Sequence, residues 1–281
     1  MTSPGFPASW LERARAILDG DLVPAEPRRA ATVVLLRQRP EGPEAYLLRR
    51  HAGMKFAAGM YAFPGGAVDP RDADHEVGWA GPAPEDWAKR FGTSPAEARA
   101  IVAAAVRETF EESGVLLAGP DTDSVVSDTT GDDWEADRVA LVDRTLGLTE
   151  FLDRRGLVLR SDLLGAWSRW VTPEFEDRRY DTWFFVAALP EGQRTRDVSG
   201  EADRVAWARP ADALVGLKAG ELGMLPPTIE TLRNLAAYDS PAAARDASAD
   251  RDLAPIMARP RLDGDRLVIE WAGIADPFGT A

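Results

Sequence analysis

One long helix has the strongest secondary-structure signal in this chain of 281 residues. Ser94, Pro95 and Glu97 take its N-cap, first and third positions, which gives a capping box with a proline already suited to the helical φ. An apolar face runs through residues 101–105, and Gly114 is typical of the residue that ends a helix in the left-handed conformation. Any fold for the chain must therefore contain this helix, whatever the length of the loop before it.

The second half of this helix carries three glutamates on one face. Glu108, Glu111 and Glu112 stand at positions i, i+3 and i+4, so their side chains converge and repel by roughly a few tenths of a kcal/mol per pair. A cation at their focus would turn this repulsion into ligation, and oxygen ligands suit Mg2+ or Mn2+. An acidic face exposed to solvent is the alternative interpretation of the same residues.

Composition excludes several classes of site. The chain has no Cys and only two His, so disulfides and Cys nucleophiles are excluded and a His-rich zinc site is disfavoured. Its formal charge is −13, from 33 basic and 46 acidic residues, which disfavours nucleic acid and anionic membranes as partners. The first ten residues lack the pattern of a signal peptide and no apolar run is long enough to span a membrane, so we expect a cytoplasmic protein.

Strands and helices alternate irregularly along the chain, which favours an α+β sandwich around a mixed sheet. Strands are predicted at residues 30–37, 44–50, 115–117, 163–171, 180–189 and 205–208. Further helices are predicted at residues 10–19, 132–148, 210–219 and 227–238. The strand at 180–189 is almost entirely apolar and is expected at the centre of the sheet.

The two ends of the chain are expected to lie outside the main domain. We predict an N-terminal helical extension at residues 1–28, a main domain at 29–240 and a C-terminal extension at 241–281. Residues 241–250 are small and polar and predict a flexible link. A hairpin is predicted at 256–271, with Asp263 and Gly264 in its turn.

The glutamate helix resembles the second half of the Nudix box. That pattern reads Gly, five residues, Glu, seven residues, then Arg-Glu-apolar-x-Glu-Glu-x-Gly-apolar, and residues 107–115 match its end with Thr109 at an apolar position. The first half resembles residues 66–72, with Asp72 where Glu is usual. Arg107 lies 41 residues after Gly66 instead of 14, so the box is split by 27 residues. We expect this insertion, at about residues 73–93, to be a helical surface excursion that leaves Gly66 close to Glu111 and Glu112.

A split box is similar to that of the Nudix coenzyme A diphosphatases. The similarity extends over about residues 30–235 and includes Leu47-Leu48, Lys55, Gly59 and the Phe63-Pro64-Gly65-Gly66 loop. Lys55 stands where Arg is usual, and Arg49 and Arg50 replace Thr or Ser. The resemblance implies a Nudix α/β/α sandwich around a mixed β-sheet, with a helical insertion inside the box.

The resemblance also implies roles for individual residues. Glu108, Arg107 and Glu111 would be catalytic, with Arg107 orienting the carboxylates through a bidentate pair. The Mg2+ or Mn2+ ligands would be Glu108, Glu111, Glu112, the carbonyl of Gly66, and Glu201, which is as well explained as a solvent-exposed loop residue. Substrate would contact Lys55, Arg49, Arg50, Phe63 and Gly65. Trp167, Trp170, Trp183 and Phe184 could stack adenine, although aromatic residues at strand spacing are more often core.

Three functions remain open at this point. The first is metal-dependent hydrolysis of coenzyme A or acyl-CoA at its diphosphate, and the second is hydrolysis of ADP-ribose, NADH or another nucleoside diphosphate derivative. The third is a non-catalytic, nucleotide-binding regulatory domain, which the intact Arg107, Glu108, Glu111 and Glu112 disfavour. In each case the partner is a small-molecule nucleotide, and a homodimer is not excluded.

Overall fold

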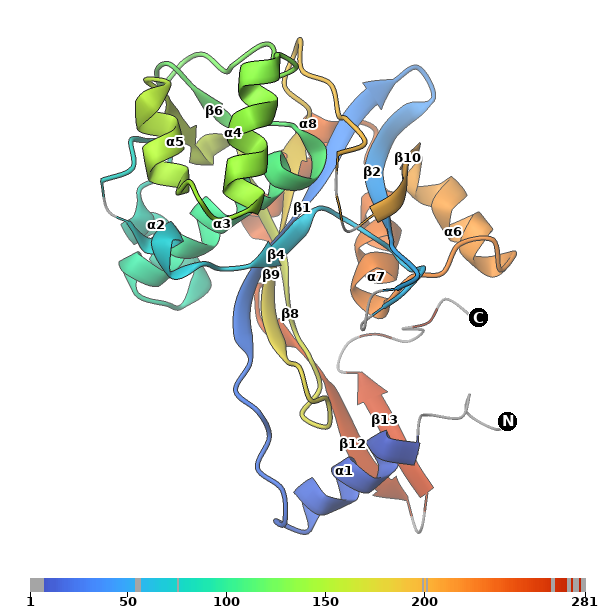
Figure 1. The fold of residues 1–281 in the computed structure, drawn as a ribbon. Helices are drawn as coiled ribbons and strands as arrows, with labels where there is room; N and C mark the ends of the chain where they lie inside the picture. The colour runs from blue at the N-terminus through green and yellow to red at the C-terminus, as the bar shows by residue number, and fades with distance from the viewer. Residues whose placement is uncertain are drawn as a thin grey trace.

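An eight-stranded mixed sheet forms the centre of the protein in the computed structural model (Figure 1). The structure describes residues 8–53, 57–74, 76–198, 200, 202–263, 266–271, 274 and 278. The main path of the sheet is β10 (Ala202–Ala208), β2 (Gly42–Arg50), β1 (Arg28–Arg39), β9 (Tyr180–Ala188), β8 (Gly165–Val171) and β11 (Pro255–Ile256). β1 pairs with β9 and β8 pairs with β11 in parallel, whereas the other neighbours on this path are antiparallel. The central position predicted for β9 is confirmed.

Short elements extend this sheet or form small sheets beside it. β3 (Tyr61–Ala62) pairs with β2, and β4 (Gly65–Ala67) pairs with β1. β5 (Trp79–Ala80), β7 (Val158–Arg160) and β6 (Ala118–Gly119) form a three-stranded sheet, and β12 (Ala258–Asp263) pairs with β13 (Arg266–Trp271) as the predicted hairpin. The strand predicted at 115–117 is wrong, because those residues run as buried coil and the ladder begins at Ala118.

Helices cover both faces of the central sheet, so the α+β sandwich is confirmed. The helices are α1 (Ala8–Leu18), α2 (Pro84–Phe91), α3 (Pro95–Ser113), α4 (Asp132–Val142), α5 (Leu148–Arg154), α6 (Pro210–Lys218), α7 (Pro226–Leu235) and α8 (Pro241–Ala247), with 3-10 turns η1 (Pro70–Ala73), η2 (Ser161–Leu163) and η3 (Ser248–Asp250). Alternate residues of β1 point to two apolar clusters, with Val33 and Leu35 facing α2 to α5 and Val34 and Leu36 facing α6 to α8. None of the described helices is long and apolar enough to cross a membrane.

The predicted boundaries of α3 are confirmed. The Ser94 hydroxyl accepts from the Glu97 amide, and the Glu97 carboxylate accepts from the Ser94 amide. At the other end Gly114 has a φ of 73°, where a residue with a Cβ would be strained. Both ends of the helix are therefore fixed by residues that are local in sequence.

The insertion is helical as predicted, but it is not only a surface excursion. Its helix α2 buries Trp87 and Phe91, whose rings pack against Phe185 of β9. The Arg90 guanidinium donates to the carbonyls of Ser248 and Ala249 near the C-terminus. The added residues thus contribute part of the apolar core on the α3 face of the sheet.

Two predictions in the second half of the chain are corrected. The helix predicted at residues 132–148 ends at Val142, because the chain turns at Arg144, and a separate helix, α5, begins at Leu148. Residues 241–250 are not a flexible link but form α8 and η3, since Ser240 caps α8 and Ala244 is fully buried. Small residues can approach the sheet closely, and composition alone does not distinguish this packing from a linker.

α1 and the β12–β13 hairpin lie at the end of the molecule opposite α4 (Figure 1). The ring of Trp10 on α1 contacts Phe175 at a centroid distance of 5.0 Å, and Arg13 donates to the Phe175 carbonyl. In the hairpin, Trp271 contacts Trp170 of β8. Both α1 and the β12–β13 hairpin therefore pack against the long β8–β9 hairpin.

Candidate active site

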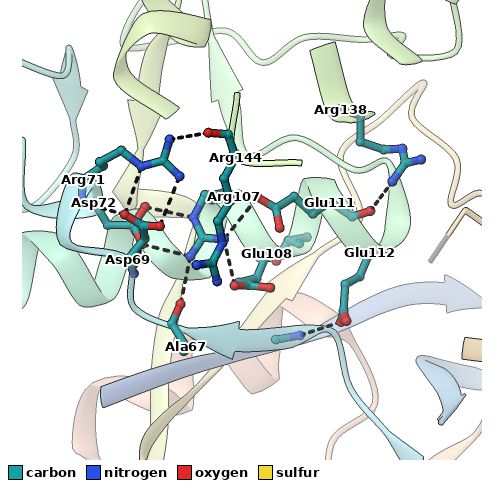
Figure 2. A network of polar contacts seen from close by, with 12 residues as sticks. Ala67, Asp69, Arg71, Asp72, Arg107, Glu108, Glu111, Glu112, Arg138 and Arg144 are labelled. Atoms are coloured by element: carbon teal, nitrogen blue, oxygen red, sulfur yellow. Dashed lines mark hydrogen bonds and ion pairs between the residues drawn. The ribbon is translucent and has the colours of Figure 1, made fainter. Parts of the chain in front are cut away.

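The three glutamates of α3 lie above the loop that follows β3 (Figure 2). In that loop β4 is paired to β1, which places Gly65 opposite Thr32 and Gly66 opposite Ala31. The Gly65 amide donates to Glu112 Oε2 at 2.8 Å. The predicted approach of the Phe-Pro-Gly-Gly loop to the acidic face is confirmed, despite the insertion between them.

Gly66 lies against the carboxylate of Glu108. A Cβ at position 66 would stand 2.5 Å from the Cδ and from both carboxylate oxygens of Glu108. No side chain fits at this distance, so the close approach requires glycine.

Arg107 connects the two halves of the box. Its Nε and Nη2 donate to the two oxygens of Asp72, each at 2.9 Å, and Nη2 also donates to the Ala67 carbonyl. Its Nη1 is shared between Glu108 at 2.8 Å and Glu111 at 3.1 Å. The bidentate pair predicted for Arg107 exists, but with Asp72 instead of the glutamates.

Asp72 is itself positioned by a turn at the start of the insertion. Asp69 caps η1, its amide donates to Asp72 Oδ2, and Pro70 occupies the first position of the turn. Asp72 is 3% exposed, so its charge is held inside the protein by the Arg107 fork. The sequence resemblance assigned no role to Asp72, although Asp69-Pro70-x-Asp72 has the capping-box pattern that indicates its position in the turn.

The acidic face of α3 is a poor environment for uncompensated negative charge. Burial raises the pKa of Glu108 to about 7, against the opposing charge of Arg107. Burial also raises the pKa of Glu111, again opposed by Arg107. For Arg107, burial lowers the pKa, but the hydrogen bond to Asp72 and the nearby carboxylates raise it overall and keep the guanidinium charged.

The chemistry of this face fits a hard divalent cation. Its donors are carboxylate and carbonyl oxygens, and the missing Cβ of Gly66 lets the Glu108 carboxylate lie against the loop. Within the described ranges, no three acidic or histidine side chains are gathered closely enough to enclose an ion. Glu108 and Glu111 turn instead toward Nη1 of Arg107, and Glu112 turns toward the amide of Gly65.

The residues predicted to bind substrate differ in their surroundings. Arg49 donates to Asp203 across the β2–β10 pair at 2.6 Å, so its charge is already balanced. Phe63 is buried in the core on the α6–α7 side. Lys55 and Glu201 lie outside the described residues. Arg50 ends β2 on the same strand as Arg49, and its amide donates to the Met60 carbonyl.

The four aromatic residues considered for adenine stacking belong to the core. They are buried in the two apolar clusters on either face of the sheet: Trp167, Trp170, Trp183 and Phe184. An adenine ring could not reach them without opening the sandwich.

Two arginines from other parts of the chain lie at the C-terminal end of α3, and no sequence motif indicated them. Arg138 of α4 donates to the carbonyl of Glu111 at 2.7 Å, and the guanidinium of Arg196 lies over Gly114. Both arginines pair with Glu135. Arg138 satisfies a carbonyl at this end of the helix, and both cations interact favourably with the negative end of the helix dipole, so they stabilise the end of the helix that carries the glutamates.

A second missed residue, Arg144, lies in the turn between α4 and α5. Its carbonyl accepts from Nη1 of Arg71 at 3.1 Å. Burial raises the pKa of Glu111 and Arg107 lowers it, and the charge of Arg144 adds a smaller lowering. In Figure 2 its side chain extends from this turn toward the acidic cluster. Nothing in the sequence around Arg144 marks it, because it is distant from the box and lies between two helices.

Comparison with known proteins agrees with this geometry. The NUDT19 Nudix domain family matches residues 84–235, more than half of the chain. A human relative named acyl-coenzyme A diphosphatase NUDT19 is 30% identical over 269 residues, with 77% of this chain and 70% of the relative covered. A chicken relative of the same name is 27% identical, with 80% and 72% covered.

A solved structure supports the same assignment. A Nudix hydrolase from Alicyclobacillus acidocaldarius is similar with a TM-score of 0.64 and 28% sequence identity, covering 82% of this chain and 99% of that one. The predicted Nudix sandwich is therefore confirmed. The chain belongs to the Nudix hydrolase family, in the branch of the NUDT19 proteins, and is an enzyme that hydrolyses phosphoric anhydrides.

Proposed function

We propose that the enzyme cleaves the diphosphate of coenzyme A or acyl-CoA, giving 3′,5′-ADP and phosphopantetheine or its acylated form. The observation that carries this proposal is the contact of Gly65 and Gly66 with Glu112 and Glu108 across a split Nudix box. The split box is the feature that the sequence shares with coenzyme A diphosphatases, and the human and chicken relatives bear that name.

We propose Glu108, Glu111 and Glu112, with the carbonyl of Gly66, as the residues that hold Mg2+ or Mn2+. When bound, such an ion polarises the phosphoryl group and balances its charge. Arg107 would hold Glu108 and Glu111 in a common orientation, while Asp72 fixes the guanidinium. The position of Glu201 as a further ligand stays a prediction.

Glu108 is the proposed proton acceptor. In the metal-free protein its pKa of about 7 means that Glu108 can gain and lose a proton near neutral pH, as a general base must. Water would form a bond to phosphorus and lose its proton to Glu108, while the bond from that phosphorus to the bridging oxygen breaks. The pKa of Glu108 will fall when a cation is bound nearby. The size of this fall decides whether Glu108 acts mainly as a general base or as a metal ligand.

A substrate panel tests the proposal. The purified protein is given coenzyme A, dephospho-coenzyme A, ADP-ribose and NADH with Mg2+ or Mn2+, and the products are identified by mass. We expect 3′,5′-ADP from coenzyme A, and no turnover in EDTA. A clear preference for ADP-ribose or NADH would favour the second function, whereas undiminished hydrolysis in a verified metal-free sample would refute the site.

A further inference from the structure

The turn after α4 contains an arginine where helices commonly use glycine. The Arg144 amide donates to Leu141 and the Thr145 amide to Ala140, a helix-ending pattern in which the residue after the C-cap is left-handed. Arg144 has a φ of 58°, whereas α2 and α3 end with glycines in this conformation. A left-handed arginine is unfavourable by itself, and strain of this kind concentrates at functional sites.

Polar contacts connect this turn to the acidic helix. Arg71 donates to the Arg144 carbonyl, and its Nε and Nη2 bind the two oxygens of Asp69 at 3.0 and 3.1 Å. Asp69 in turn holds Asp72, which holds Arg107. The position of the Arg144 backbone is therefore set by the same network that orients the glutamates (Figure 2).

The Arg144 side chain is not used by this network. It is exposed, and its guanidinium forms no hydrogen bond or ion pair with the part of the chain that the structure describes. The side chain extends toward the acidic cluster, close enough for its charge to act on Glu111. In a protein of net charge −13, a polyanionic substrate needs such a local cation.

We propose that Arg144 binds the diphosphate group of the substrate beside the glutamates, as a catalytic residue outside the Nudix box. This inference rests on the proposed function and adds a contact to it. A guanidinium presents a planar pair of donors that matches two phosphate oxygens. Because the Arg144 side chain extends toward the acidic cluster, we expect its ligand to be the group that is cleaved and not a phosphate at the far end of the nucleotide.

Arg144→Gly separates this role from a structural one. Glycine removes the guanidinium and relieves the left-handed strain, so we expect an unfolding midpoint equal to or above the parent value. We expect kcat/KM to fall about 10- to 100-fold, as for loss of a charge-assisted contact. Arg144→Lys should recover part of this loss because it keeps the charge. Arg154→Ala, at an exposed arginine at the end of α5, controls for net charge and should leave kcat/KM unchanged.

The choice of substrate identifies the group that is bound. We expect the same fold-loss on coenzyme A, dephospho-coenzyme A and ADP-ribose, and weaker calorimetric binding of inorganic diphosphate to Arg144→Gly. A loss confined to coenzyme A would show that Arg144 contacts the 3′-phosphate and would overturn the proposal. Parent activity in Arg144→Gly, or a loss matched by a lower unfolding midpoint, would overturn it as well. If the parent cleaves none of these substrates, the proposed function fails, while the diphosphate titration still decides the role of Arg144.

Discussion

Arg107 and Arg144 border the same glutamates, but Arg107 is buried and fully hydrogen-bonded whereas Arg144 is exposed. Arg107 is 9% exposed, and its donors are engaged by Asp72, Ala67, Glu108 and Glu111. Arg144 is exposed, and among the described residues only its backbone is held, by Arg71 and Leu141. Arg107 has no donor left for a ligand. Arg144 has a fixed backbone and a guanidinium that can still bind a ligand.

The difference indicates a division of labour around the site. A buried cation with every donor satisfied acts on the geometry of its neighbours and is sensitive to the loss of any partner. An exposed cation contributes little to stability and can exchange water for a substrate oxygen. Substitutions on the buried side should therefore lower stability and activity together, and substitutions on the open side should lower activity alone.

The largest effect is expected from Asp72→Asn, on the buried side. The change leaves Arg107 without the fork that balances its charge, which we expect to lower the free energy of unfolding by about 3 kcal/mol or more. Activity should fall as well, because Glu108 and Glu111 lose their common anchor. Chemical denaturation with parallel assays measures both, and Asp74→Asn two residues away is the control. An Asp72→Asn protein of parental stability would remove the distinction between the two sides.

Glu112→Gln tests the acidic face that both arginines border. Glutamine can still accept from the Gly65 amide, so the fold should survive with its unfolding midpoint nearly unchanged. Loss of one proposed ligand and its charge should reduce turnover at least about 100-fold, the upper range seen when only a supporting residue of a metal site is lost. Glu150→Gln on α5 is the matched control. Early melting of Glu112→Gln would show that the acidic face is structural.

A smaller effect is expected from the titration of Glu108 in the metal-free protein. Its pKa rises from an ordinary 4.5 to about 7 in the fold, so the folded state binds more protons than the unfolded state between these values. The contribution to stability is full below pH 4.5 and is lost as the pH rises through 7. Urea unfolding in EDTA from pH 4.5 to 8 should show this decline, and Glu108→Gln should flatten it. A Glu108-dependent rise in stability over this window would contradict the burial argument.

The smallest effect is expected from Arg49→Ala. Because Arg49 is paired with Asp203, we expect kcat/KM for coenzyme A to change less than about 3-fold, as for an exposed ion pair. Lys55→Ala should instead abolish the preference for coenzyme A over dephospho-coenzyme A. Steady-state kinetics on both substrates compare these variants with Arg144→Gly. A loss at Arg49 equal to that at Arg144 would mean that the Asp203 pair opens to bind substrate.

The sequence predicted what depends on local signals. The capping box of α3, its glycine end and the spacing of Glu108, Glu111 and Glu112 are short-range patterns, and each determined one part of the structure. The approach of the Gly65-Gly66 loop to the acidic face followed from the resemblance together with the low cost of lengthening a loop, although Gly66 lies against Glu108 rather than the predicted Glu111 and Glu112.

Features that depend on contacts distant in sequence were not predictable. Residues 241–250 fold as α8 because Ala244 meets the sheet, which their polar composition does not indicate. Trp87 and Phe91 join the core because β9 lies opposite, about a hundred residues later in the chain. Arg144 reaches the site because α4 ends beside Arg71, and no motif spans these two positions.

The pairing of the central strands sets an order on synthesis. β1 lies in register with β9, so Arg28 meets Tyr180 only after some 150 intervening residues have left the ribosome. The contacts of the insertion form later still, because Arg90 of α2 donates to the carbonyls of Ser248 and Ala249. The residues of α3 are therefore synthesised well before the sheet that they pack against is complete. Chaperones that bind exposed apolar strands should engage the nascent chain until β9 and the C-terminal residues emerge.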